Sequence, residues 1–152
     1  QVSGRAGRRD KPGRVAIQLT DTNHPLLPFL QQHDYAAFFN WELNSRKAFD
    51  YPPFTRIILL QTRHKDKSTC HAAMHFITAY LEKRVGSSRL KGPAEPPVNR
   101  IRNLYIMELL LKIPAQATPL VQTKKYIRDA VVELMAQPGL KAVRVSVDVD
   151  AL

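Results

Sequence analysis

The order of strand-like and helix-like segments in residues 55–150 constrains the fold more than any other feature of this sequence. Two continuously apolar runs, residues 57–60 and 104–113, predict strands that are covered on both faces. A weak extended segment, residues 87–98, contains three prolines and therefore suits an edge strand or a loop. The last segment, residues 141–149, alternates valines with polar residues and predicts a second edge strand.

Two amphipathic segments separate these strands. The first begins at Asp66 or Ser68 and ends near Arg84, and its apolar stripe consists of Cys70, Ala73, Met74, Ile77 and Leu81. The second begins at the capping pair Thr118-Pro119 and stops at Pro138-Gly139. The complete order is β-α-β-β-α-β. It predicts an α+β, ferredoxin-like sandwich with a four-stranded antiparallel sheet, in which the first and third strands are central.

The residues before this domain predict two further regions. Residues 21–54 contain two helical segments, 24–33 and 34–49, which break near His33-Asp34. We expect this helical connector to cover the second face of the sheet, because a central strand that is apolar throughout must be covered on both sides. In residues 1–20, alternating apolar positions from Arg14 to Leu19 predict a short strand. The domain boundaries are therefore 1–20, 21–54 and 55–152.

The charge balance favours a polyanionic partner. The formal net charge is +10 and the isoelectric point is about 10.1, which favours DNA, RNA or an acidic peptide. Cys70 is the only cysteine, so disulfides within the chain are excluded, and we expect it to be a buried small hydrophobe. No apolar run approaches the length that spans a bilayer, so we expect no membrane partner and a cytoplasmic location.

The first eight residues have the spacing Gln-x-x-Gly-Arg-x-x-Arg. Two arginines three residues apart can reach one anionic group together, since guanidinium forks match phosphate oxygens. The octet resembles motif VI of superfamily 2 helicases. That resemblance implies that Gln1, Gly4, Arg5 and Arg8 would contact ATP, with Arg5 and Arg8 as catalytic arginines. A solvated basic arm is an equally good interpretation of the octet alone.

The rest of an ATPase site is missing from the sequence. Nothing matches the phosphate-binding pattern Gly-x-x-x-x-Gly-Lys-Ser/Thr, and no acidic motif that would hold magnesium occurs. We therefore expect the chain to be the C-terminal part of a larger enzyme and to be inactive in ATP hydrolysis by itself. Its octet would be a remnant of the second helicase lobe.

Several blocks of residues resemble a more specific family. In order along the sequence they are 11–15, 33–35, Phe39, Glu42-Leu43, Arg46, Tyr51-Pro52-Pro53-Phe54, 92–94, 109–112 and 147–150. Together they resemble the C-terminal part of the primosomal protein N′ family, the bacterial replication-restart helicases of superfamily 2. The resemblance covers essentially the whole chain. The Tyr-Pro-Pro-Phe block with Glu42 and Arg46 is more specific than the helicase octet.

This resemblance implies a set of functions. The family comprises ATP-dependent 3′-to-5′ DNA helicases that recognise stalled replication forks and restart replication by primosome assembly. ATP and magnesium would bind the full-length parent, which would act at replication forks in the nucleoid. Zinc would bind only a region upstream of this chain. The C-terminal domain would bind forked and single-stranded DNA, other primosome proteins, and the acidic tail of single-stranded DNA-binding protein. The candidate residues for that tail are Gln122, Lys124 and Lys125.

Basic residues supply the candidates for DNA contact, because phosphates attract lysine and arginine without regard to base sequence. The alternative interpretation of these basic residues is that they belong to an ordinary solvated surface. The candidates occupy two turns: Arg63, Lys65 and Lys67 after the first strand, and Arg100 and Arg102 before the third.

Three other interpretations are less favoured. His71 and His75 are four apart on a helix but lack a third ligand, so we expect no metal site. Tyr105 is the lone aromatic residue of the third strand, which argues against base stacking on the sheet. The octet disfavours a ribosomal RNA-binding protein. The main alternative is a module that binds the acidic tail with little DNA binding of its own.

Overall fold

The computed structural model describes residues 15–115 and 117–150, and the chain divides into two compact units. One unit comprises Gln1–Glu42 and the other Leu43–Leu152. Helix α2 (Tyr35–Ala48) crosses the boundary between them.

The first unit contains α1 (Leu26–Gln32) and the start of α2. The predicted break at His33-Asp34 is confirmed. His33 has a left-handed backbone with φ 54°, and the Asp34 side chain accepts a 2.9 Å hydrogen bond from the Ala37 amide. The rings of Phe29, Phe38 and Trp41 pack against one another in tilted arrangements, with centroids 5.8–6.3 Å apart.

The strand expected from Arg14 to Leu19 is wrong over its described residues. Residues 15–19 have no regular structure, and the side chains of Val15, Ile17 and Leu19 are exposed. Alternation alone does not make a strand, because a strand is stabilised by hydrogen bonds to a neighbouring strand. In the described part of the chain, no strand pairs with residues 15–19. Arg14 lies outside the described residues.

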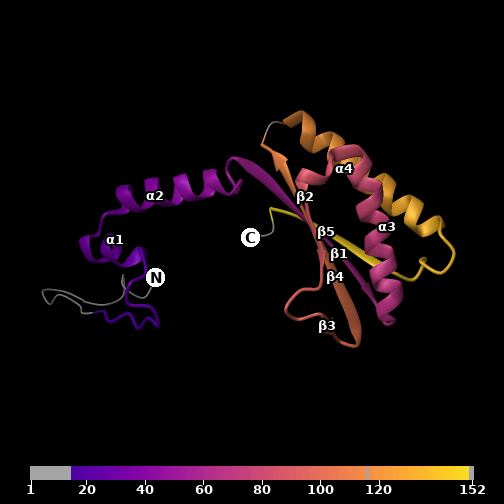
Figure 1. Cartoon of the computed structure of the whole chain (residues 1–152), viewed down its shortest axis with the longest axis horizontal. Coiled ribbons are helices and arrows are strands. Elements are labelled where there is room, and N and C mark those ends of the chain that lie inside the picture. The colour runs from indigo at the N-terminus through magenta and orange to yellow at the C-terminus, as the bar shows by residue number, and fades with distance from the viewer. Residues whose placement is uncertain (1–14, 116, 151–152) are drawn as a thin grey trace, which may run out of the picture. The chain divides into compact units, whose positions relative to one another are not determined.

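The second unit has the predicted β-α-β-β-α-β order with one additional strand (Figure 1). Its sheet is antiparallel with strand order β2-β4-β1-β5, and short β3 pairs with β4. The predicted first and third strands, β1 and β4, are therefore central, as expected. The elements are β1 (Thr55–His64), α3 (Lys67–Val85), the 3-10 turn Ser87–Arg89, β2 (Leu90–Ala94), β3 (Arg100–Ile101), β4 (Leu104–Pro114), α4 (Ala117–Ala136) and β5 (Arg144–Val149).

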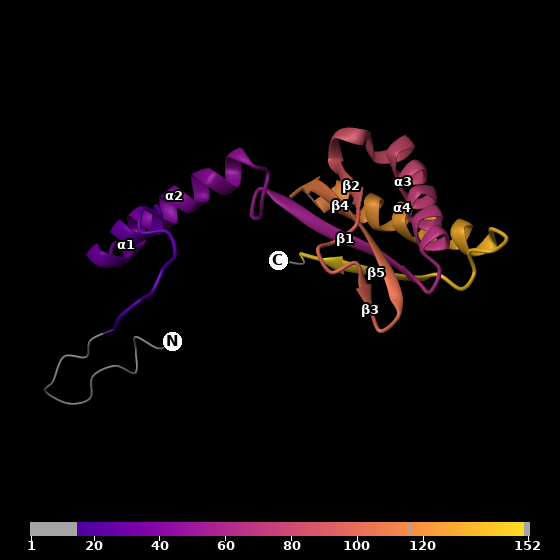
Figure 2. The same cartoon turned by 60° about the horizontal axis from the view of Figure 1, so that its bottom comes forward.

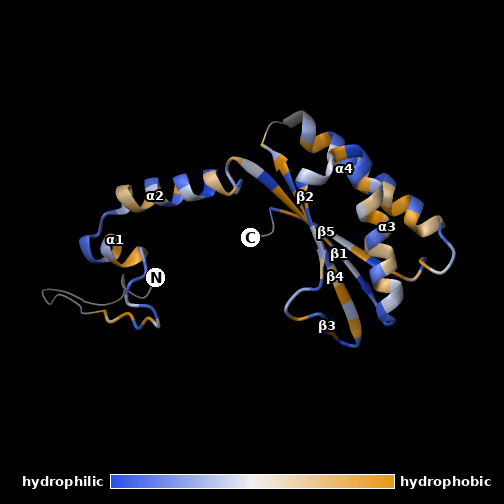
Figure 3. Ribbon diagram, in the orientation of Figure 1, coloured by the Kyte–Doolittle hydropathy of each residue, from blue (hydrophilic) through white to orange (hydrophobic). Residues whose placement is uncertain are grey.

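Helices α3 and α4 cover one face of the sheet, which we call the helix face; Figure 2 shows both helices on the same side. The whole predicted stripe of α3 is fully buried there. Facing it from the strands are Ile58, Leu60, Leu109 and Leu111, which are also fully buried. Orange apolar segments mark these strands and helices in Figure 3. Burial of this size supplies the main driving force for folding of the domain.

The opposite face, which we call the open face, carries a mixture of apolar and polar side chains. Alternation along the strands assigns it the buried Ile57 and Ile106, the half-buried Leu59 and Leu110, and the pair Gln61 and Glu108. The Gln61 amide donates to Glu108 Oε1 at 2.7 Å. Coverage of this face by the helices of residues 24–49 stays a prediction.

Local geometry also follows from particular residues. Asp66 caps α3: its carboxylate accepts from the Thr69 amide at 2.7 Å and from the Ser68 hydroxyl. These hydrogen bonds, first that from Ser68, lower the pKa of Asp66 to about 2. Gly92 has φ +108°, and a side chain there would approach the Glu108 carbonyl oxygen to 3.1 Å. Glycine is therefore required where the β2–β4 register shifts.

Candidate nucleic-acid interface

The motif candidates Gln1, Gly4, Arg5 and Arg8 lie outside the described residues. Their contact with ATP stays a prediction.

The five DNA-binding candidates come together at one end of the sheet. His64 at the end of β1 pairs with Tyr105 of β4, and Tyr105 also pairs with Arg100 of β3. The carboxyl end of β1, the start of α3 and the β3–β4 turn are therefore neighbours, at the lower end of the sheet in Figure 1. We call this surface the basic end, and its residues are Arg63, Lys65, Lys67, Arg100 and Arg102.

The β3–β4 hairpin fixes the two arginines of this turn. Arg102 and Asn103, its central residues, both have positive φ, 49° and 61°, as in the two-residue hairpin turns that favour Asn-Gly. An arginine is strained in this left-handed conformation. The Arg100 guanidinium lies 4.9 Å from the centroid of the Tyr105 ring and 3.4 Å from Asn103 Oδ1. The turn therefore holds Arg100 in place and leaves Arg102 exposed.

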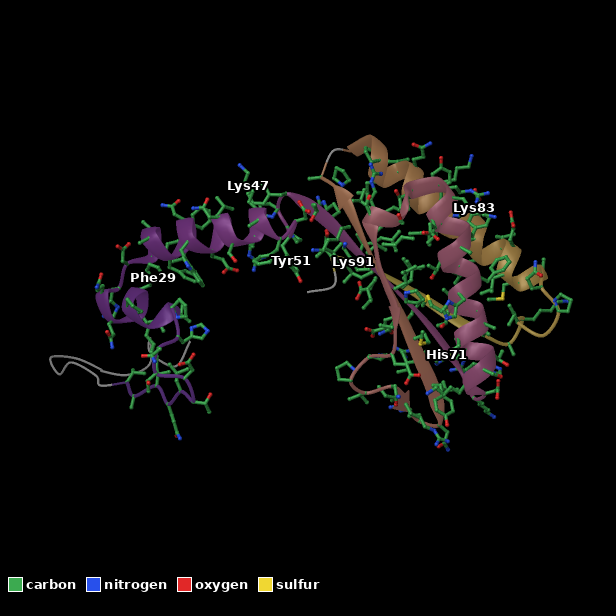
Figure 4. The ribbon with its side chains drawn as sticks, viewed as in Figure 1. Phe29, Lys47, Tyr51, His71, Lys83 and Lys91 are labelled. Atoms are coloured by element: carbon green, nitrogen blue, oxygen red, sulfur yellow. The ribbon has the colours of Figure 1, made fainter. Side chains whose placement is uncertain are left out.

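Lys67 differs from the other four residues because a carboxylate partly neutralises it. Its Nζ lies 2.7 Å from Glu95 Oε1, and His71 Nε2 lies 3.1 Å from the same oxygen. The hydrogen bond to Glu95 raises the pKa of Lys67, and the same bond lowers the pKa of Glu95. Figure 4 shows His71 on α3 near this end of the sheet. His71 thus pairs with a loop carboxylate.

Arg144 belongs to the same surface, although the basic clusters of the sequence did not include it. It is the first residue of β5 and pairs directly with Arg63 of β1. The alternation of residues 141–149 already placed Arg144 opposite the valines, but only the strand pairing brings it beside Arg63. The Arg63 Nη2 donates to Gln61 Oε1 at 2.6 Å, while its Nε is buried with no hydrogen-bond partner among the described residues.

A second basic feature is an open groove of about 520 Å³ in the second unit. Its basic lining residues are Arg89, Lys91 and Lys112, and Asp50 is the acidic one; Figure 4 marks Lys91. The ammonium group of Lys112 already has two partners within the chain. Its Nζ donates to the Phe49 carbonyl at 2.6 Å and lies 4.2 Å from the Tyr51 ring centroid. The groove therefore offers fewer free cations than the basic end.

The candidates for binding an acidic tail lie elsewhere. Gln122, Lys124 and Lys125 occupy the first turns of α4, which follows the end of β4 opposite to the basic end (Figure 1). Lys124 and Lys125 are exposed, and Gln122 donates to the Tyr126 hydroxyl at 2.7 Å. Residues 116–118, which precede them, are not described in full. The structure thus separates the two sets of candidates.

Residues 15–115 and 117–150 contain no group of three or more His, Cys, Asp or Glu side chains that could hold a metal ion. Within the same ranges, every helix is too short or too polar to cross a membrane.

The sequence matches known proteins over most of its length. Residues 47–152 match the family model of the primosomal protein N C-terminal domain. The chain is 33% identical to replication restart protein PriA of Haemophilus influenzae and 36% identical to that of Treponema pallidum, each over 99% of its length. It is 32% identical to the Bacillus subtilis protein over 74% of its length.

The relatives are much longer than this chain. The matches span 20% of the Haemophilus influenzae protein, 22% of the Treponema pallidum protein and 14% of the Bacillus subtilis protein. The similarity therefore concerns one region of each relative. Since the family model covers residues 47–152, which include the whole ferredoxin-like sandwich, the chain belongs to the primosomal protein N C-terminal domain family.

Proposed function

We propose that this chain is the DNA- and partner-binding domain of a replication-restart helicase. One observation carries the proposal: five basic residues from two separate segments gather at one end of the sheet. Such a cluster attracts phosphates strongly and reads no base sequence. The substrates would be forked and single-stranded DNA, at which the parent protein would assemble the primosome.

The catalytic part of this function would belong to the full-length parent. There, Arg5 and Arg8 would contact the triphosphate of ATP together with magnesium, Gln1 and Gly4. Zinc would bind only upstream of this chain. We expect the chain by itself to bind DNA without hydrolysing ATP.

Binding of the chain to forked and single-stranded DNA at two salt concentrations tests the proposal. We expect affinity at low salt and a fall of at least tenfold when the salt is raised fourfold, because each phosphate contact releases a counterion. A variant in which Lys65, Arg100 and Arg102 are changed to Ala should lose most of this affinity. Absence of measurable binding at low salt would contradict the DNA-binding proposal.

The alternative is a module that binds the acidic tail of single-stranded DNA-binding protein and has little affinity for DNA. Exposed Lys124 and Lys125 support it, because they offer two cations to acidic residues. The substitution Lys124→Glu separates the two functions, since Lys124 is remote from the basic end. Loss of tail-peptide binding with unchanged DNA binding would assign the tail to α4. Equal loss of both would argue against separate sites.

A further inference from the structure

The pairing of Arg63 with Arg144 places two like charges directly opposite each other across β1 and β5. Directly opposed side chains on one face have Cβ atoms about 5 Å apart, and like charges at that separation destabilise the pair. Strand alternation puts both side chains on the open face, since their neighbours Thr62 and Val145 belong to the helix face. A sheet normally places an acidic or neutral residue in such a position.

No carboxylate in the described part of the chain compensates this pair. Glu108, the nearest acidic residue of β4 on the same face, accepts from Gln61. Asp148 lies four residues along β5, opposite Leu59, and Asp150 pairs with Arg56. The side chain of Arg144 has no hydrogen bond or ion pair with residues 15–115 or 117–150.

The contacts around Arg63 fix the position of its guanidinium. Gln61 Oε1 accepts from Arg63 Nη2 at 2.6 Å and from the Ser146 hydroxyl at 3.5 Å, which orients the guanidinium. The Arg63 Nε is buried and donates to no atom of residues 15–115 or 117–150. A buried donor without an acceptor is costly, so Arg63 is held in this position at some cost to stability. Arg100, Arg102 and Lys65 at the same end of the sheet increase the local positive potential.

We propose that Arg63 and Arg144 together grip one backbone phosphate of a nucleic acid on the open face of the sheet. Two planar guanidinium forks on adjacent strands suit the tetrahedral oxygens of a phosphate, which accepts from both at once. Binding would also remove the repulsion between the two arginines. This proposal rests on the DNA-binding function above and adds a residue, Arg144, and a face of the sheet to it.

Single-stranded DNA binding by the chain and its Arg63→Ala, Arg144→Ala and double variants tests the proposal. Arg128→Ala is the matched control, because it removes the same charge from an exposed position of α4, on the other side of the sheet. We expect each single variant at the pair to weaken binding roughly tenfold and to lower the salt slope by about one. The double variant should lose little more than either single variant, and Arg128→Ala should change affinity less than about twofold. Arg144→Lys should recover only part of the loss.

The outcomes separate this proposal from the proposed function. Thermal unfolding should show that Arg144→Ala is at least as stable as the wild type, since the repulsion is gone. If Arg144→Ala binds single-stranded DNA as tightly as the wild type does, the proposed site is overturned, while the DNA-binding function stands. Additive losses in the double variant would overturn the shared phosphate. A polyglutamate peptide that binds as tightly as DNA of equal charge would overturn the nucleic-acid assignment. If the wild type binds no DNA, both proposals fail.

Discussion

The two faces of the sheet are formed by the same strands but differ in burial and in charge. On the helix face, neighbouring side chains of β1 and β4 are fully buried against α3 and α4. On the open face, Ile57 and Ile106 are buried, but Leu59 and Leu110 are only half-buried, and Arg63 of β1 lies opposite Arg144 of β5. Most of the buried apolar core therefore lies on the helix face, and the polar side chains of the open face, with the basic end, are available for a ligand.

The largest difference between the two faces should appear when adjacent leucines of β1 are truncated. Leu60→Ala removes a fully buried side chain from the helix face and should lower the free energy of unfolding by about 3 kcal/mol. Leu59→Ala, its matched control on the open face, should cost about half as much or less, because Leu59 is only half-buried. Urea unfolding measures both. Equal losses would mean that the open face is as fully covered as the helix face.

The next effect concerns the strained turn at the basic end. Arg102→Gly should raise the free energy of unfolding by about 1 kcal/mol, because glycine adopts a positive φ without strain. The same substitution should weaken DNA binding severalfold by removing a phosphate contact. Urea unfolding and DNA titration in parallel check the pair of effects. A variant that gains stability and retains full affinity would remove Arg102 from the interface.

A smaller effect should depend on pH. The pKa of Asp66 is lowered from 3.8 to about 2, so its contribution to stability is fully present above pH 4 and is lost as the pH falls through 2. The unfolding midpoint of the wild type should therefore exceed that of Asp66→Ala at pH 7 and approach it near pH 2. Asp66→Asn, which retains a capping side chain, should show a smaller pH dependence. A difference that persists below pH 2 would contradict the capping role of the carboxylate.

The smallest expected effect concerns the ion pair between Glu95 and Lys67, which should reduce the affinity of the basic end for DNA. Glu95→Gln should release Lys67 from its ion pair and raise DNA affinity about twofold at low salt. The increase should vanish in high salt, where charges are screened. Glu82→Gln, which removes an exposed negative charge from α3, is the control. An unchanged or lower affinity for Glu95→Gln would indicate that the ion pair positions the loop for binding.

Local signals in the sequence predicted much of the second unit. The burial of Cys70 and its stripe, the Asp66 cap and the central position of two strands follow from periodicity and apolar content, which depend only on near neighbours. The two-residue strand β3 was not predicted, because pairing of Arg100 with Tyr105 depends on the turn geometry at Arg102 and Asn103. A strand at residues 15–19 was predicted wrongly from alternation without a pairing partner.

The candidate site was predictable in part. The basic clusters named Arg63, Lys65, Lys67, Arg100 and Arg102, but their proximity results from strand pairing across about 40 residues of sequence. The opposition of Arg63 and Arg144 is set by register between strands at the two ends of the domain. The ion pair between Lys67 and Glu95 likewise depends on the path of a loop. Such long-range contacts have no local signature in the sequence.

Mapping by nuclear magnetic resonance tests the central claim most directly. Single-stranded DNA added to the isotope-labelled chain should shift the backbone amide signals of residues 63–67, 100–102 and 144. The signals of α4 near Lys124 and Lys125 should stay unchanged, which would place the DNA at the basic end. Shifts confined to α4, or to the groove at Lys91 and Lys112, would contradict the account.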